Sequence, residues 1–563
     1  MKTSKYAQPQ GFEMARRDWP SRSIRKSPIW NAVDLRDGNQ ALPDPMSPAQ
    51  KKRYFQLLCE IGFKEIEVGF PSASRDDFQF CRDLIEQKLI PDDVTIAILT
   101  QAREPLIKRS FEALRGVGRA ICHVYIATSD LHMNYVFRKD RAQTADTALA
   151  SVELIRRQAK ALGDSEIRLQ FSPEEFTDTD LDFAVSLCDQ VVETWQPERG
   201  KKVILNLPAT VERRMPNQYA DMVEEFIRRQ RHREQSIISV HAHNDMGCAV
   251  ASTQMTLLAG ADRVEGTLFG HGERSGNVDL VTMALNLQYF GIDTGLDFHD
   301  VESIRDEIIK LTGMPVSPRH PYAGELVFSA FSGSHQDAIH KGLAGREQLT
   351  GDFGGWKIPY LHIDPAELGR RYEKFIRINS QSGKGGIAHV LETDYKVRLP
   401  RALLIDFSRH VQQLADQVSR EIESSEIWQL FNQCYNRQEG PLVMDKYWPR
   451  PNHDDPARID GEVHVRFKGE RHELTASANG PVAAFVHALE KLSLPSFSLE
   501  EYEEDAIGSS ADAQAITFVR LDDDEKRSWY GIGFDQNIDQ AAVRAVVSAL
   551  NRMLEGKGEN VAK

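Results

Sequence analysis

Short apolar runs alternate with amphipathic stretches between about residue 30 and residue 290. The runs are rich in β-branched side chains, which predicts strands. Eight candidate strands lie at 29–37, 65–70, 94–100, 120–129, 167–174, 202–210, 237–245 and 263–270. The stretches between them have helical periodicity, most clearly where Ala148, Val152 and Ile155 share one stripe. Eight strand–helix units over about 260 residues predict an α/β fold, a (β/α)8 TIM barrel.

A doubly wound open sheet is the alternative arrangement of these units. It usually carries a Gly-rich fingerprint after its first strand, and DLRDGNQAL (34–42) is not one. Two later Gly-rich stretches, FGHGERSGN and NSQSGKGG, have neither the dinucleotide spacing nor a complete P-loop. The barrel is therefore favoured, and nucleoside triphosphate binding is disfavoured.

The regular alternation stops after the eighth unit, and helical segments continue to about residue 436. Four prolines and no apolar periodicity in the following stretch indicate a boundary. Beyond it, GEVHVRF and ERHELTASA predict strands, and NGPVAAFVHALEKL predicts a helix capped by Asn479. A second round follows with AQAITFVRL, SWYGIGF and a C-terminal helix, so we expect an α+β domain with an internal repeat. The predicted organisation is an N-terminal arm (1–29), the barrel (30–300), helical linker subdomains (301–436), the Pro-rich boundary (437–460) and a C-terminal regulatory domain (461–563).

The net charge of −14 argues against a general nucleic-acid binder or a protein of acidic membrane surfaces. The six cysteines are scattered without a C-x-x-C pair, which is typical of reduced thiols in the cytoplasm. The N-terminus lacks the apolar core of a signal peptide, and no stretch approaches the ~18 apolar residues of a membrane span. We therefore expect a cytoplasmic protein that meets any anionic substrate with a local basic site.

Polar side chains gather at the carboxyl ends of the predicted strands, where barrel enzymes place their active sites. These are Arg36 and Asp37 after the first strand, Glu174 after the fifth, Thr210 after the sixth, and His241 and His243 after the seventh. An H-x-H pair alone is weak evidence, because a lone histidine more often has a structural role.

A carboxylate and two imidazoles, completed by an amide oxygen or water, suit Mg²⁺, Mn²⁺ or Zn²⁺. In a closed barrel the first and seventh strands end close together, so Asp37, His241 and His243 are predicted to hold a divalent cation. Arg36 would then be a planar donor beside the metal, for a carboxylate or a developing oxyanion.

Five segments together resemble the long-chain 2-isopropylmalate synthases, within the wider family of barrel enzymes that condense or cleave acyl-CoA thioesters. They are DLRDGNQAL, HAHNDMGCAV, EGTLFGHGERSGN, SGSHQDAI and NSQSGKGG, in this order, and the match runs from about residue 25 to the C-terminus. The resemblance implies the first committed step of leucine biosynthesis. In this step acetyl-CoA, 3-methyl-2-oxobutanoate and water give 2-isopropylmalate and CoA.

The resemblance also implies a role for each matching residue. Asp37, His241 and His243 would be the metal ligands, with Asn277 at or next to the fourth position. Arg36 would orient the keto acid, Thr210 and His123 would contact it, and Glu174 would close the site. His335 and Tyr360 would come from the region after the barrel, from the partner subunit of a homodimer. We expect His335 to be the base or its relay, since an imidazole has a suitable pKa, and a hinge residue is its structural alternative.

The implied cofactors are a divalent metal, Mg²⁺ with Mn²⁺ or Zn²⁺ as alternatives, and a monovalent activator, K⁺. The C-terminal repeat resembles the leucine-binding regulatory domain of these synthases through NGPVAAFVHAL and YEEDAIGSSADAQA. The implied regulatory residues are Asn479, Gly480, Asp505, Ser510 and Ala511, with L-leucine as feedback inhibitor. Ser510 stands where the family commonly has glycine, and Asp505 where it has histidine. Alternative functions are a homocitrate or citramalate synthase, an acyl-CoA lyase, and a catalytically inactive amino-acid sensor.

Overall fold

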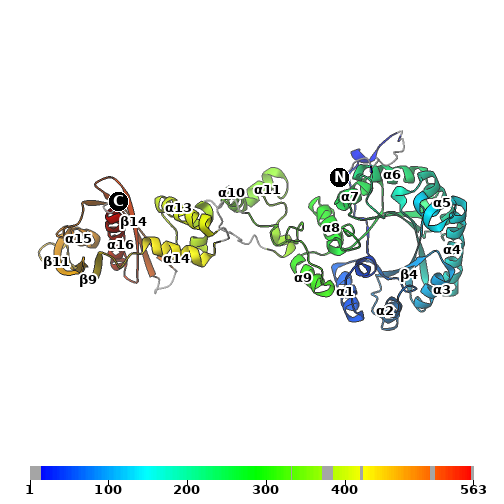
Figure 1. The fold of residues 1–563 in the computed structure, drawn as a ribbon, viewed down its shortest axis with the longest axis horizontal. Coiled ribbons are helices and arrows are strands. Elements are labelled where there is room, and N and C mark those ends of the chain that lie inside the picture. The colour runs from blue at the N-terminus through cyan, green and yellow to red at the C-terminus, as the bar shows by residue number, and fades with distance from the viewer. Residues whose placement is uncertain are drawn as a thin grey trace. The chain divides into compact units, whose positions relative to one another are not determined.

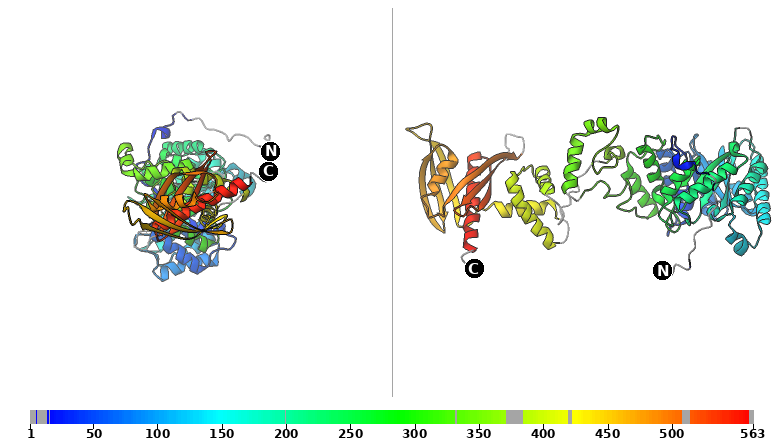
Figure 2. Two further views of the ribbon diagram at one scale, coloured as in Figure 1. Left: turned by 90° about the vertical axis from the view of Figure 1, so that its left-hand side faces the viewer. Right: turned by 90° about the horizontal axis from the view of Figure 1, so that it is seen from above.

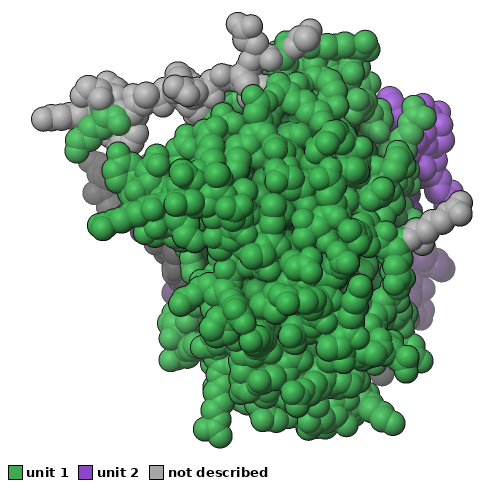
Figure 3. Space-filling view, turned by 90° about the vertical axis from the view of Figure 1, so that its right-hand side faces the viewer, with its two compact units in different colours: residues 1–327, 363–371 green, residues 328–362, 372–563 purple. Residues whose placement is uncertain are grey.

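The computed structural model describes residues 16–198, 200–330, 333–370, 384–418, 422–507 and 514–559, together with residues 5 and 14. The chain forms two compact units: unit 1 comprises 1–327 and 363–371, and unit 2 comprises 328–362 and 372–563. Figure 3 colours the two units separately. Within the described ranges, every helix is too short or too polar to cross a lipid bilayer.

Unit 1 is built on a closed barrel of eight parallel strands, as predicted. The strands are β1 (Ile29–Ala32), β2 (Glu65–Gly69), β3 (Thr95–Gln101), β4 (Arg119–Ala127), β5 (Glu166–Glu174), β6 (Val203–Ala209), β7 (Ser236–Ala242) and β8 (Arg263–Gly266). The barrel closes because β1 pairs with both β2 and β8.

Helices surround the ring of strands (Figure 1). They are α1 (Pro48–Ile61), α2 (Arg75–Glu86), α3 (Glu104–Ala113), α4 (Arg141–Ala161), α5 (Leu181–Trp195), α6 (Pro216–Arg229), α7 (Ala249–Ala259) and α8 (Leu280–Tyr289), and α9 (Val301–Thr312) follows. Local sequence sets their ends: α1 starts with a capping box between Ser47 and Gln50 and stops at Gly62, which has φ +114°. A side chain at Gly62 would collide with the carbonyl of Gly295.

Two predicted strands are shorter than expected, and the difference shapes the site. β1 ends at Ala32, and a π-helical turn, η3 (Asp34–Gly38), follows it. β8 ends at Gly266, before the short turn η7 (Leu268–Gly270). The reason is Asp34, whose Oδ1 accepts hydrogen bonds from the Tyr54 hydroxyl (2.7 Å) and from the Leu268 amide (2.8 Å). The turns after β1 and β8 are thereby tied together.

The barrel contains buried charged groups in addition to an apolar cluster of Ala97, Ile121 and Ile204. Arg263 on β8 is fully buried and donates to Glu65 on β2 and to Glu265 two residues along its own strand. Arg168 on β5 reaches Glu65 from the other side of the barrel (2.6 Å). Because residues two apart on a strand share a face, Glu67 and Glu265 lie one layer closer to the carboxyl ends.

A segment before β1 binds the outside of α6. The guanidinium of Arg17 donates two hydrogen bonds to the carboxylate of Asp221 (2.8 and 2.9 Å). The indole of Trp19 donates to the same carboxylate (2.9 Å), and the Asp18 amide donates to Glu224 (3.1 Å). The buried acidic face of α6 is therefore covered by this segment.

Unit 2 contains helices followed by two three-stranded antiparallel sheets. The helices are α10 (Gly333–Ala344), α11 (Arg346–Phe353), α12 (Lys384–Asp394), α13 (Arg401–Val418), α14 (Ser424–Tyr435), α15 (Pro481–Leu489) and α16 (Ile538–Glu559). The sheets are β9 (Leu442–Pro451), β10 (Ile459–Phe467) and β11 (Glu470–Ala478), and β12 (Phe497–Ile507), β13 (Gln514–Asp523) and β14 (Ser528–Asp535). Figure 2 shows α16, in red, lying along the second sheet.

The α+β architecture with a repeat is confirmed, but each repeat has three strands and not two. β9 lies inside the stretch interpreted as a boundary, where Pro449 and Pro451 are compatible with its position at the sheet edge. β12, the other strand missed, is also an edge strand. The first helix of the repeat begins at Pro481, and its N-cap is Gly480 without a side-chain hydrogen bond, so the predicted cap at Asn479 is wrong.

The sheet β12–β14 has an apolar core on each face. Val519 and Leu521 of β13 pack with α15 and α16 and with the first sheet. Ile516 and Phe518, on the opposite face of β13, pack with α12, α13 and α14. The linker helices and the C-terminal sheet consequently share a core, and residues 372–563 fall in one unit without a division at 437–460.

Candidate metal centre and its cavity

A cavity of about 340 Å³ opens at the carboxyl ends of the barrel strands. Polar residues predicted from the sequence line it together with apolar ones. The lining includes Arg36, Asp37, Phe70, Leu99, His123, Tyr125, Ser172, Glu174, Asn206, Pro208, Thr210, His241, His243 and Arg274. It therefore combines a charged region with an apolar wall.

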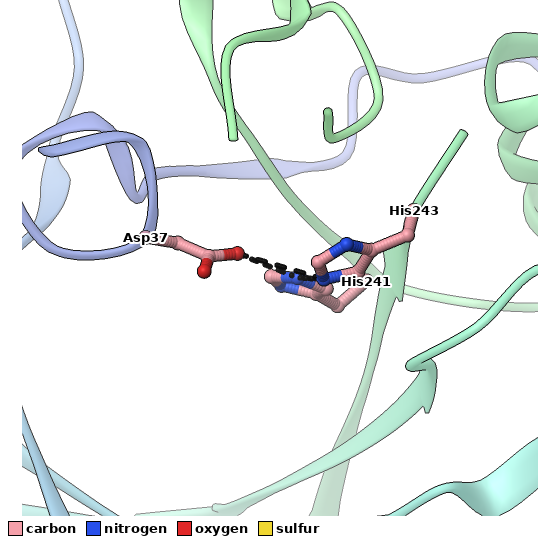
Figure 4. A group of neighbouring side chains, drawn as sticks. All are labelled: Asp37, His241 and His243. Atoms are coloured by element: carbon pink, nitrogen blue, oxygen red, sulfur yellow. Dashed lines mark hydrogen bonds and ion pairs between the residues drawn. The ribbon is translucent and has the colours of Figure 1, made fainter. Parts of the chain in front are cut away.

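Asp37, His241 and His243 converge in this cavity (Figure 4). Asp37 comes from η3, His241 from β7, and His243 follows directly after that strand. Asp37 Oδ2 lies 3.3 Å from His241 Nε2 and 3.6 Å from His243 Nε2, and the two Nε2 atoms are 3.2 Å apart. All three side chains are buried, and one ligand atom from each lies within 4.8 Å of the others.

The charges around this cluster attract a cation. Burial alone would raise the pKa of Asp37, but Arg36 and the two imidazoles lower it well below its usual range. Burial alone would lower the pKa of His241, but hydrogen bonds to Asp37 and Glu265 raise it to about 9. Burial and the neighbouring His241 lower the pKa of His243 to about 4. One positive charge is therefore favoured between the imidazoles, and a bound metal ion replaces protons at such ligands.

Asn277 is a further candidate ligand near this cluster. Among the described residues, its amide oxygen Oδ1 is buried without a hydrogen-bond partner. Asn277 pairs with His243 in an isolated β-bridge, and its amide nitrogen donates to the carbonyl of His271 (3.0 Å). Asn277 is thus a backbone neighbour of His243 with an unpaired amide oxygen. The carboxylate of Asp37 and the two imidazole nitrogens form a donor set that suits Mg²⁺, Mn²⁺ or Zn²⁺.

Glu265 orients one of the imidazoles and was missed in the sequence. Its Oε2 accepts from His241 Nδ1 (3.1 Å), which fixes the ring so that Nε2 points toward Asp37. Its Oε1 accepts from Arg263, Gln170 (2.6 Å) and Asn31 (3.1 Å). The signal available in the sequence was a charged residue, Glu265, inside the predicted strand 263–270.

Arg36 is held by two carboxylates and begins a second chain of polar contacts. Its Nε donates to Glu67, and its terminal nitrogen lies 3.0 Å from Asp37. Glu67 also accepts from His123 Nδ1 (2.6 Å), and His123 Nε2 contacts the hydroxyl of Ser172 (2.7 Å). Both ring nitrogens of His123, predicted as a substrate contact, are therefore engaged by protein groups.

Glu174 and Thr210 lie at the cavity as expected from their strands. Burial raises the pKa of Glu174, and the positive charge of Arg36 opposes this shift only in part. Thr210 accepts from the Glu175 amide (2.9 Å), and its carbonyl accepts from Arg274 (2.7 Å). Arg274, which was not singled out from the sequence, also pairs with Asp245 (2.7 Å).

The remaining predicted residues belong to unit 2. His335 on α10 and Tyr360 stack on each other, with ring centroids 3.9 Å apart. Gly480 precedes α15, and Asp505 lies exposed on β12, where its carboxylate accepts from the Ala506 amide (2.8 Å). Ser510 and Ala511 lie outside the described residues.

Three family models match the chain. Residues 27–308 match the HMGL-like family, 325–392 the alpha-isopropylmalate synthase, post-catalytic domain-like family, and 421–554 the LeuA allosteric (dimerisation) domain.

Similar full-length proteins carry one common name, 2-isopropylmalate synthase. The protein of Rhodospirillum rubrum is 49% identical over 544 residues, covering 96% of this chain and 97% of its own. That of Ralstonia nicotianae is 48% identical over 542 residues, covering 95% and 92%. That of Clostridium acetobutylicum is 43% identical over 554 residues, covering 98% and 99%.

Proposed function

The chain belongs to the family of 2-isopropylmalate synthases, and from that premise we propose how its barrel cavity performs the reaction. Acetyl-CoA condenses with 3-methyl-2-oxobutanoate, and hydrolysis of the condensed thioester releases 2-isopropylmalate and CoA. The observation that carries the proposal is the convergence of Asp37, His241 and His243 beside Arg36 in one cavity.

We assign the divalent cation to Asp37, His241 and His243, with the free amide oxygen of Asn277 as a fourth protein donor. When bound, Mg²⁺, or alternatively Mn²⁺ or Zn²⁺, supplies Lewis-acid polarisation of the keto group. Arg36, kept in place by Asp37 and Glu67, presents a fixed positive charge to the keto-acid carboxylate. The low-dielectric surroundings strengthen that attraction.

The apolar wall of the cavity favours a branched keto acid. Phe70, Leu99, Tyr125 and Pro208 line it, and an isopropyl group can be buried against such a surface. The second carboxylate of 2-oxoglutarate would need an additional cation. Of the lining residues, the arginines are Arg36 and Arg274, and both already pair with carboxylates.

We assign removal of the methyl proton of acetyl-CoA to His335, with Tyr360 stacked against it. These two side chains lie in unit 2, and we place them at the barrel of the partner subunit in a homodimer. The match of residues 421–554 to an allosteric dimerisation domain supports an assembly of this kind. We further propose L-leucine as the regulator bound by that domain, and K⁺ as an activating ion.

The proposal is tested with a panel of keto acids in the presence of acetyl-CoA, Mg²⁺ and K⁺, with released CoA measured by a thiol reagent. We expect the highest kcat/KM for 3-methyl-2-oxobutanoate and loss of activity after exhaustive chelation. A higher kcat/KM for 2-oxoglutarate would replace the proposal with a homocitrate synthase, and one for pyruvate with a citramalate synthase. Turnover that survives chelation would remove the metal from the mechanism.

A further inference from the structure

Three side chains on different strands form a hydrogen-bonded row along the wall of the cavity. Ser172 lies on β5, His123 on β4 and Glu67 on β2. The Ser172 hydroxyl is 2.7 Å from His123 Nε2, and His123 Nδ1 is 2.6 Å from Glu67 Oε2. Ser172 and His123 line the cavity, and Glu67 is fully buried behind them.

The partners of this row determine the direction of its hydrogen bonds. Glu67 is a carboxylate, since burial opposes its charge but Arg36 and His123 lower its pKa. A carboxylate only accepts, so His123 Nδ1 carries the hydrogen. In the neutral imidazole, Nε2 is then an acceptor, and the hydroxyl of Ser172 must donate to it.

Asn206 supports this assignment from the other side of the serine. Its amide nitrogen donates to Ser172 Oγ (3.0 Å), so one lone pair of that oxygen is occupied and its hydrogen is left for His123. The order hydroxyl, imidazole, carboxylate is the arrangement that removes a proton from an oxygen nucleophile in hydrolases. Orienting the keto acid or holding Arg36 would not require a serine at the end of the row.

We propose that Glu67, His123 and Ser172 form the proton relay for the hydrolysis of the condensed thioester. This inference rests on the proposed function, whose second half needs an activated water. The oxygen of water forms a bond to the thioester carbonyl carbon while its proton passes to Ser172 Oγ, and the serine proton passes to His123 Nε2. When the carbon–sulfur bond breaks, the CoA thiolate leaves and takes back that proton, so the products are a carboxylic acid, which ionises, and free CoA.

The carboxylate of Glu67 therefore has two tasks, one toward Arg36 and one toward His123. Oxygen Oε1 of Glu67 fixes Arg36, and Oε2 fixes the tautomer of His123. Replacing Glu67 would disturb both tasks at once. Among the described residues, the side-chain partners of the Ser172 hydroxyl are His123 and Asn206, so replacing Ser172 leaves the contact between Glu67 and Arg36 in place.

The test compares Ser172→Ala, Ser172→Thr and the control Ser110→Ala. Ser110 is a fully buried serine on α3, and its hydroxyl has no hydrogen-bond partner within the described part of the chain, so the control removes a buried hydroxyl away from the cavity. Each protein receives acetyl-CoA and 3-methyl-2-oxobutanoate, and in separate reactions the preformed condensed CoA thioester. Released thiol gives the hydrolysis rate, and mass spectrometry of acid-quenched samples gives the condensed thioester.

We expect Ser172→Ala to lower kcat for the preformed thioester about 100-fold or more, in line with general-base catalysis, with little change in KM. The condensed thioester should accumulate in the complete reaction, because carbon–carbon bond formation continues. Ser172→Thr keeps the hydroxyl and should recover most of the rate. Unchanged folding is checked by the melting temperature and by Mg²⁺ affinity.

Three results would overturn the relay. They are hydrolysis by Ser172→Ala within about threefold of the parent, an equal loss of condensation and hydrolysis, and failure of threonine to restore the rate. A parent protein that forms no product from 3-methyl-2-oxobutanoate would instead refute the proposed function. The relay would then be tested with the keto acid that reacts.

Discussion

Replacing His243 with alanine should separate cation binding from folding. The His243 side chain is 9% exposed, and its Nδ1 is buried without a hydrogen-bond partner among the residues that the structure describes. It lies 3.2 Å from His241 and is disfavoured there in its charged form. An unsatisfied buried polar atom costs about 1–3 kcal/mol, which offsets the packing lost with the ring. We therefore expect the free energy of unfolding of the metal-free variant to lie within about 1 kcal/mol of that of the metal-free parent.

Metal affinity should respond much more strongly. Loss of a partner in the outer shell of a metal site costs 10–100-fold in affinity, and His243 contributes a donor directly. A cation at about 100 times the parent dissociation constant stabilises the parent by about 2.7 kcal/mol. If affinity falls 100-fold, the same concentration stabilises the variant by only about 0.4 kcal/mol.

Calorimetric titration of the chelator-treated proteins with Mg²⁺ and Mn²⁺ measures the affinity. Thermal unfolding with and without the cation measures the linked stabilisation. His232→Ala is the matched control, because His232 lies on the outside of the barrel and pairs with Glu193 (3.0 Å). A His243→Ala variant that binds both cations within twofold of the parent would refute the assignment.

Three further changes test the frame around the site. Burial raises the pKa of Asp34 to about 7, so the stability that its protonated form contributes is full below about pH 4 and is lost as the pH rises to 7. Asp34→Asn should therefore make the urea midpoint less dependent on pH between these two values. Asp221→Asn weakens the contact with the half-exposed Arg17, so we expect the free energy of unfolding in urea to fall by about 1 kcal/mol and proteolysis before residue 29 to become faster. An unchanged cleavage rate would contradict this prediction. A chain ending at Asn452 removes Phe518 and its neighbours from the core of α12–α14, so we expect a loss of helical ellipticity larger than the deleted helices α15 and α16 account for, and loss of any leucine response. A decrease no larger than the share of α15 and α16 would show that this core is dispensable.

The barrel was predictable because buried parallel strands appear in a sequence as apolar runs separated by amphipathic helices. β9 and β12 were missed for the opposite reason. Their exposed edge positions allow Pro449 and Pro451 in one strand and the acidic run from Glu500 to Asp505 in the other. Neither composition is typical of a strand, and these segments are strands because they pair with β10 and β13.

The predicted metal residues converge because a local rule places the two histidines and a long-range contact places the aspartate. His241 and His243 are two apart at the end of a strand, which puts them on one face. Asp37, by contrast, reaches them from the π-helical turn η3, whose formation depends on Asp34 contacting Tyr54 and Leu268. Asp37 could be predicted from its position after an apolar run. The turn could not, because it is stabilised by the Tyr54 hydroxyl and the Leu268 amide, which lie far along the chain.

Charge balance in the barrel explains why Asp37 is the carboxylate available to a cation. Three glutamates and three arginines are bonded to one another inside the barrel and at its mouth: Glu65, Glu67, Glu265, Arg36, Arg168 and Arg263. Each of these carboxylates is therefore compensated by a guanidinium, which is what deep burial of charge requires. Asp37 shares Arg36 with Glu67, so its own charge is compensated only in part. A divalent cation at Asp37 restores the balance and leaves positive charge for an anionic keto acid, in a protein whose net charge of −14 would otherwise repel it.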